Sequence, residues 1–184
     1  MNQNDNLATI TLGGGCFWCI EAALGQVEGI HRAISGYAGG RADTANYRSV
    51  CSGTTGHAEV VQIHYDPREI ATEEVLEIFF TAHDPTTLNR QGNDVGPQYR
   101  SVIFYHNEAQ KAAAEKVIQE TASQMYGAPI VTELAPLDVF YPAEAEHQDY
   151  YERVGNRNPY CSFVISPKVN KVRKKYAHRI RANS

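Results

Sequence analysis

Three consecutive glycines, Gly13 to Gly15, separate two segments with opposite secondary-structure preferences. The segment before them, ATITL (8–12), is short and rich in β-branched residues, which predicts a strand. The segment after them, FWCIEAALGQV (17–27), predicts a helix that begins near Cys16. We therefore expect a strand–turn–helix unit with a cysteine at the first turn of the helix.

The rest of the chain continues this alternation. Further strands are predicted over 29–40, where the strand runs into a glycine-rich loop, and over 57–67, 101–106 and 130–137. Thr72 is predicted to cap one helix, and Asn107 a second helix that reaches about Tyr126. The first of these helices has an apolar face made of Val75, Leu76, Phe79 and Phe80. Residues 41–56 are expected to be loop, and residues after Phe140 to be irregular.

The order β-α-β-β-α-β, followed by an extra α-β unit, predicts the α+β class. We expect a two-layer α/β sandwich whose core has the ferredoxin-like split βαβ plan. Its sheet should be mixed, and a loop-rich C-terminal segment should follow it.

Charge is distributed unevenly along the chain. No acidic residue follows Glu152, whereas nine of the 17 Lys and Arg residues lie after it. We expect this basic tail, 168–181, to be a terminal helix or arm held on an acidic body. The alternative is a nucleic-acid or anionic-lipid patch, which we disfavour because no binding motif accompanies the charge.

The sequence also suggests a compartment. No apolar run approaches the roughly 20 residues that span a bilayer, so a membrane protein is not expected. The first residues show no secretory signal, and four cysteines in such a chain favour reactive or metal-binding thiols over structural disulfides. We therefore expect a cytoplasmic protein, and a monomer.

Cys16 has the setting of a nucleophile. Only the thiolate attacks, and unpaired N–H groups at a helix start favour that charge. Three readings are open. Cys16 and Cys19 form a thiol-disulfide redox pair, Cys16 is a hydrolase nucleophile activated by His57 or His147, or Cys16 works with partners distant in sequence. A zinc site is disfavoured because Cys51 and Cys161 are isolated in the sequence.

The segment GGGCFWCIEA (13–22) resembles the methionine sulfoxide reductase A family, whose signature is Gly-Cys-Phe-Trp. The resemblance extends through GYAGG, YRSVCSGTTGHAEVVQIHYDP, HDPTTLNRQGNDVGPQYRS and FYPAEAEHQDYY in the family's order. It implies a single reductase domain over 1–184, with a family core over 7–151. Residues 152–184 would then be a C-terminal segment carrying the resolving cysteine and the basic tail.

The resemblance implies a role for each matched residue. Cys16 matches the nucleophile, and Phe17 and Trp18 match the aromatics that hold the methyl group of the sulfoxide. Glu59 matches the acid that protonates the sulfoxide oxygen. The remaining matches are polar groups of the same site: Tyr47, Tyr99 and Asp94. Such chemistry suits these residue types, since an apolar pocket raises a carboxyl pKa and phenols stabilise oxygen without carrying charge.

The family reduces the S epimer of methionine sulfoxide, free or in oxidised proteins, and so repairs oxidative damage. Cys16 would become a sulfenic acid and then a disulfide, which an external dithiol such as thioredoxin reduces. This scheme needs no metal and no bound organic cofactor. For the resolving thiol, Cys161 is preferred because its surroundings have the composition of a mobile loop. Cys19 is the second candidate, and Cys51 is expected to be a buried or bystander thiol.

Overall fold

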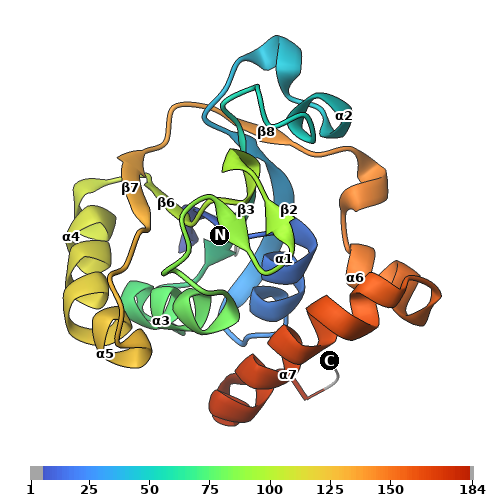
Figure 1. Ribbon diagram of the computed structural model, residues 1–184. Coiled ribbons are helices and arrows are strands. Elements are labelled where there is room, and N and C mark those ends of the chain that lie inside the picture. The colour runs from blue at the N-terminus through green and yellow to red at the C-terminus, as the bar shows by residue number, and fades with distance from the viewer. Residues whose placement is uncertain (1–5, 183–184) are drawn as a thin grey trace.

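A six-stranded mixed sheet organises the computed structural model, which describes residues 6–182 (Figure 1). The sheet order is β7-β6-β1-β3-β2-β8, with β6 and β7 parallel and the other neighbours antiparallel. The α+β class and the mixed sheet are therefore confirmed. The strands are β1 (Ala8–Gly13), β2 (Ile30–Ala38), β3 (Ala58–Tyr65), β6 (Val102–Tyr105), β7 (Glu133–Pro136) and β8 (Phe140–Pro142). A small separate hairpin pairs β4 (Arg90–Gln91) with β5 (Asp94–Val95).

Helices cover one face of the sheet and contact one another (Figure 1). The covering helices are α1 (Phe17–Gly25), α3 (Thr72–Ala82) and α4 (Glu108–Val117), and α7 (Ser166–Lys175) packs on α1 and α3. Strand β3 shows why the sheet has two different faces. Val61 and Ile63 point into the large core under the helices, whereas Val60 points into a smaller cluster on the opposite face. The predicted apolar face of the helix over 72–82 is fully buried, as expected.

The pairing of the four central strands determines where the glycines lie. Strand β1 lies between β6 and β3, and α1 connects it to β2 two places away. The register places Gly13 opposite Val102 and Tyr37 opposite Glu59. β1 ends at Gly13, and the antiparallel strand β3 begins beside it. The segment after β1 therefore starts at the same end of the two strands as Glu59.

Helix starts were predicted with mixed success. Asn107 caps α4, since its Oδ1 accepts the Gln110 N–H at 2.9 Å, and a π-helical turn, Ile118–Ala122, carries the helix on to α5 (Ser123–Tyr126). The prediction for Thr72 was wrong. Ala71 holds the cap position, and the Thr72 hydroxyl instead lies 2.6 Å from the phenol oxygen of Tyr65. A tertiary hydrogen bond has replaced the local one.

Two regions expected to be irregular contain regular elements. The loop 41–56 includes the one-turn helix α2 (Tyr47–Val50), capped by Asn46. The chain after residue 140 forms β8, the short helix α6 (Tyr150–Val154) and α7, so 130–137 is not the last strand. Apolar side chains that pack into the core explain this, since Ile165, Val169 and Val172 are buried despite the polar composition around them.

The basic tail is held on the body of the protein, as expected. Arg179 makes a two-pronged ion pair with Glu74 on α3, at 2.9 and 2.6 Å, and Ile180 forms a β-bridge with Val27. Among residues 6–182, no helix has the length and apolarity needed to cross a membrane. The predicted domain begins and ends in residues 1–5 and 183–184, which lie outside the described residues.

Candidate active site

Cys16 lies at the N-cap position of α1, directly after the glycine turn. Gly15 has φ +84°, which favours glycine, and its N–H donates to the Tyr99 carbonyl at 3.1 Å. At Gly14, a Cβ atom would come within 2.6 Å of the His83 ring. The turn is therefore closely packed, and it holds the thiol with only 7% of the residue exposed.

This burial corrects the expectation that the helix start lowers the pKa of the thiol. Loss of solvent raises the pKa of Cys16 well above its ordinary value, and the neighbouring Cys19 and Glu59 raise it further. A backbone hydrogen bond from Trp18 acts in the opposite direction but is outweighed. The resting site thus keeps the Cys16 thiol protonated, because desolvation exceeds the effect of the helix end.

Glu59 lies on β3 and is 1% exposed. Its Oε1 accepts the backbone N–H of Phe17 at 3.1 Å, which fixes the carboxyl beside the first turn of α1. Burial raises the pKa of Glu59 to about 8, although the Phe17 hydrogen bond opposes that shift. At neutral pH most molecules therefore carry a protonated Glu59, whose second oxygen is free of the Phe17 contact and can donate.

An aromatic cluster surrounds this pair. Phe17 is fully buried and its ring stacks at 6.3 Å on Tyr47, which also lies 6.3 Å from the Trp18 ring. The backbone N–H of Tyr47 donates to Glu144 Oε2 at 3.1 Å, and this bond fixes the start of α2 against the chain that follows β8. Glu144 Oε1 also accepts the phenol of Tyr37 at 2.9 Å.

The two predicted tyrosines remain neutral donors. Burial raises the pKa of Tyr47 and of Tyr99 above the ordinary phenol value, and the charge on Glu59 contributes at both positions. Tyr99 ends the 3₁₀ turn Pro97–Tyr99, and its backbone carbonyl accepts the Gly15 N–H. Both phenols can therefore donate hydrogen bonds to a developing oxygen anion without losing their own protons.

Asp94, the last predicted polar residue, lies on β5 and has a partner that was not predicted. The Tyr160 phenol donates to Asp94 Oδ2 at 2.6 Å. Tyr150 was not predicted either, and its ring stacks on Trp18 at 3.8 Å with an interplanar angle of 8°. His147, considered above as an activating base, instead packs as a ring 4.2 Å from Tyr47. Glu144, His147 and Tyr150 belong to the block FYPAEAEHQDYY, so that motif already indicated their region of the chain.

The four cysteines are all free thiols. Cys19 follows Cys16 by one helical turn, with its N–H donating to the Cys16 carbonyl at 3.0 Å, and it is fully buried. Cys161 is 1% exposed and opens the π-helical turn Cys161–Ile165 that continues into α7. The expected mobile loop around Cys161 is thus wrong in this conformation. Cys51 is exposed at the end of α2.

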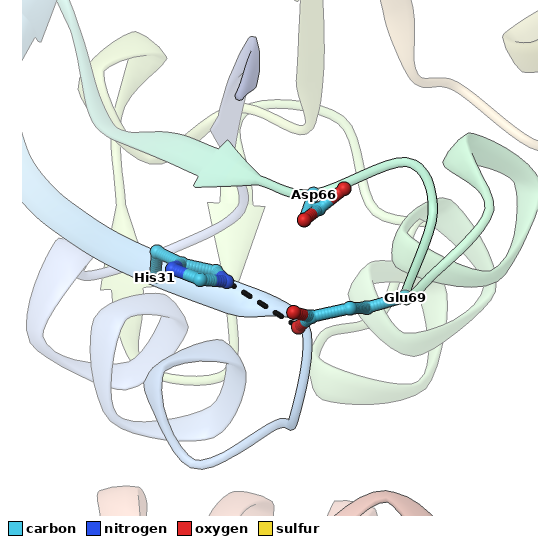
Figure 2. Close-up of side chains that lie close together, drawn as sticks. All are labelled: His31, Asp66 and Glu69. Atoms are coloured by element: carbon cyan, nitrogen blue, oxygen red, sulfur yellow. Dashed lines mark hydrogen bonds and ion pairs between the residues drawn. The ribbon is translucent and has the colours of Figure 1, made fainter. Parts of the chain in front are cut away.

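Within the described residues, two side-chain clusters have the composition of a metal site. The first joins His31, Asp66 and Glu69 at the opposite end of β3 from Glu59 (Figure 2). There His31 Nε2 lies 3.3 Å from Glu69 Oε2, while both Asp66 oxygens accept hydrogen bonds from Arg68.

The second cluster joins Glu144, Glu146 and His147. Its Glu144 oxygens accept the hydrogen bonds from Tyr37 and Tyr47. Glu146 Oε1 lies 3.9 Å from His147 Nε2, so ion pairs and hydrogen bonds account for the carboxylates of both clusters.

Comparison with known proteins agrees with the motifs. A family model described as peptide methionine sulfoxide reductase matches residues 8–180. The chain is 51% identical over 187 residues to a peptide methionine sulfoxide reductase MsrA from Ralstonia nicotianae, covering 99% of this chain and 97% of the relative.

Two solved structures are also similar. Reduced Mxr1 from Saccharomyces cerevisiae has a TM-score of 0.75 and 37% identity, and the match covers 84% of this chain and 87% of Mxr1. Mxr1 in complex with Trx2 has a TM-score of 0.55 and 30% identity, with 82% and 88% covered.

Proposed function

The chain belongs to the peptide methionine sulfoxide reductase family and reduces methionine sulfoxide; from that premise we propose that Cys16 is the nucleophile and Glu59 the acid. One observation carries the proposal. Glu59 is buried, carries its proton at neutral pH, and is fastened by the Phe17 N–H one residue from the thiol. An acid in that state and place is what expulsion of a sulfoxide oxygen requires.

The reductase step is a two-electron oxidation of the thiol. The Cys16 thiol gives up its proton as its sulfur attacks the sulfoxide sulfur, and Glu59 donates its own proton to the sulfoxide oxygen. Phenol donors from Tyr47 and Tyr99 stabilise that oxygen as its charge develops. The sulfoxide S–O bond then breaks as the hydroxyl bonds to the Cys16 sulfur, the temporary sulfur–sulfur bond breaks, methionine leaves, and Cys16 is left as a sulfenic acid. The Cys16 proton restores the acid form of Glu59, so protons balance over the step.

The walls of the site support the proposed substrate class. Phe17 and Trp18 offer apolar surface for a methyl group, while Asp94 and the phenols address the polar side of the sulfoxide. We propose the S epimer of methionine sulfoxide as the substrate, free or in oxidised proteins, on the resemblance described above. Repair of oxidised methionine is the corresponding role.

Recycling needs a second thiol. We propose that Cys161 attacks the Cys16 sulfenic acid, forming a disulfide and releasing water. Because Cys161 is buried at a helix start, that attack requires the segment to move. Cys19 remains the second candidate, because it lies one helical turn from Cys16 in the same core. Thioredoxin is the proposed reductant, supported by the similarity to Mxr1, whose structure with Trx2 is known.

Single-turnover assays on cysteine variants test these assignments. Cys16→Ser should abolish reduction of N-acetyl-methionine-S-sulfoxide. Cys161→Ser should still yield close to one methionine per enzyme but lose cycling with thioredoxin, and peptide mapping of oxidised wild type should find the Cys16–Cys161 disulfide. Full cycling in Cys161→Ser, together with a Cys16–Cys19 disulfide, would transfer the resolving role to Cys19. Cys51→Ser is the matched control and should cycle normally.

Three further proposals, on domain organisation, oligomeric state and location, rest on the sequence. We propose one domain over the whole chain, a monomer, and a cytoplasmic location. For the core we also propose the ferredoxin-like description, supported by the order β6-β1-β3-β2 with α1 and α3 as its two connections.

A further inference from the structure

The C-terminal segment places a phenol directly on a residue of the proposed substrate site. Tyr160 donates to Asp94 Oδ2 at 2.6 Å, a short hydrogen bond of the kind made to carboxylates. The same phenol oxygen lies 4.0 Å from the Cys19 sulfur. Burial raises the pKa of Tyr160, and the nearby Cys16 and Cys19 raise it further.

A second tyrosine, which lies just before this segment, covers the indole. Tyr150 stacks on Trp18 at 3.8 Å, and the Tyr160 ring meets the same indole edge-on at 6.0 Å. Asn158 connects the two tyrosines, because its Nδ2 donates to the Tyr150 phenol at 2.8 Å and its Oδ1 accepts the Tyr160 N–H at 2.9 Å. Tyr150, Asn158 and Tyr160 therefore form one hydrogen-bonded unit, here called the C-terminal cap.

The reacting groups are closed off beneath this cap. Cys16 is 7% exposed, Glu59 is 1% exposed and Phe17 is fully buried. A methionine sulfoxide must bring its sulfur to Cys16 and its oxygen to Glu59, and both groups have too little exposed surface in this conformation to contact it. A side chain that covers Cys16 and Glu59 therefore has to move away before a substrate can bind.

We propose that Tyr160 is a built-in occupant of the substrate site, and that a methionine sulfoxide binds by displacing its phenol from Asp94. This inference rests on the proposed function, since it takes Asp94 and Trp18 as substrate contacts. The cap then competes with every substrate, and the apparent dissociation constant is the intrinsic one divided by the fraction of molecules with the cap open. The strength of the Tyr160 contact thus sets how far the apparent dissociation constant of a substrate exceeds the intrinsic one.

The single tryptophan of the chain gives a direct readout. Trp18 carries the Tyr150 stack, so its fluorescence changes when the cap leaves. We would titrate the full-length Cys16→Ser protein, which binds but does not turn over, with N-acetyl-methionine-S-sulfoxide. The same titration would be made in the Cys16→Ser/Tyr160→Phe protein, which keeps the ring and loses only the phenol oxygen.

The expected result is a half-saturating concentration about tenfold lower in the Tyr160→Phe protein, because a hydrogen bond to a charged group no longer holds the cap closed. The matched control is Tyr151→Phe, whose phenol lies 2.6 Å from the Ser166 hydroxyl in the same segment and does not touch Asp94. That control should bind as the parent does. Unfolding curves for both variants confirm that the proteins compared are folded.

Three results would overturn the inference. Unchanged binding in Tyr160→Phe means that the phenol does not compete with substrate. Weaker binding means that Tyr160 is a substrate contact. Equal tightening by Tyr151→Phe means that any loosening of the segment has the same effect. Failure of the proposed function is distinguishable, because it appears as absence of sulfoxide reduction by the wild-type chain.

Discussion

Glu59→Gln separates the chemistry of the carboxyl from its place in the fold. Glutamine keeps the shape of the protonated side chain and an oxygen that accepts the Phe17 N–H, which lies 3.1 Å away in the wild type. It has no proton to transfer. Since general acids contribute about 10²- to 10⁴-fold to rate, the single-turnover rate should fall by about that factor, with a smaller change in substrate binding.

The same substitution should change how stability depends on pH. The folded pKa of Glu59 is about 8, against an ordinary 4.5, so the folded chain holds this proton where the unfolded chain has lost it. The stability that protonation contributes is complete below the ordinary pKa and is lost as pH rises through the folded one. From about pH 6 to about pH 8 the wild type should lose about 2 kcal/mol relative to Glu59→Gln, because the slope of about 1.4 kcal/mol per pH unit falls to half as the pH reaches the folded pKa.

Two measurements check this reasoning. Rapid-quench single turnovers give the rate, and urea unfolding at several pH values gives the free energy of unfolding. The wild-type rate should fall at alkaline pH as Glu59 ionises, and the variant should lack that fall. Glu77→Gln on α3 is the control for the rate. Burial also raises the pKa of this carboxyl, but its charged neighbour is Lys175, which takes no part in the reaction. An unchanged rate in Glu59→Gln refutes the acid role, and a pH-independent stability difference refutes the effect of burial.

Two substitutions test the fold. Asn107→Ala removes the oxygen that accepts the Gln110 N–H at 2.9 Å, and should lower the free energy of unfolding by about 1 kcal/mol in urea titrations. Gly36→Ala places a Cβ 2.4 Å from the Tyr141 carbonyl oxygen and 2.5 Å from the Phe140 ring, so β8 must separate from β2. That change should lower the free energy of unfolding by about 2 kcal/mol or more, and a fully stable variant would contradict the close packing of these strands.

Local sequence was sufficient for much of the site. The glycine turn places Cys16, Phe17 and Trp18 at one helix start, because turn and helix preferences act over a few residues. Glu59 and the tyrosines came from matched motifs. The pKa of Cys16 could not be predicted, since it depends on burial by elements far along the chain, which outweighs the local helix end.

The C-terminal segment shows the limit of prediction most clearly. Its Gly, Asn and Pro content predicted loop, but Cys161 and Ile165 pack into the core and the segment is helical. The contact between Tyr160 and Asp94 joins positions 66 residues apart. No periodicity in either segment encodes such a pairing, because it arises only when the last third of the chain folds back over α1.

The segment that carries Cys161 is fastened at both ends. Before it, the Gln148 side chain makes two hydrogen bonds to the backbone of Ser35, at 3.0 and 2.8 Å, and after it Ile180 bridges to Val27. If the cap and the turn behind it detach, they remain a closed loop over α1 and not a free tail. Such a tether sets an effective concentration of about millimolar order for the Cys161 thiol, whatever the supply of thiols outside. A sulfenic acid at Cys16 would therefore meet the Cys161 thiol ahead of any external thiol or oxidant that is present well below millimolar concentration.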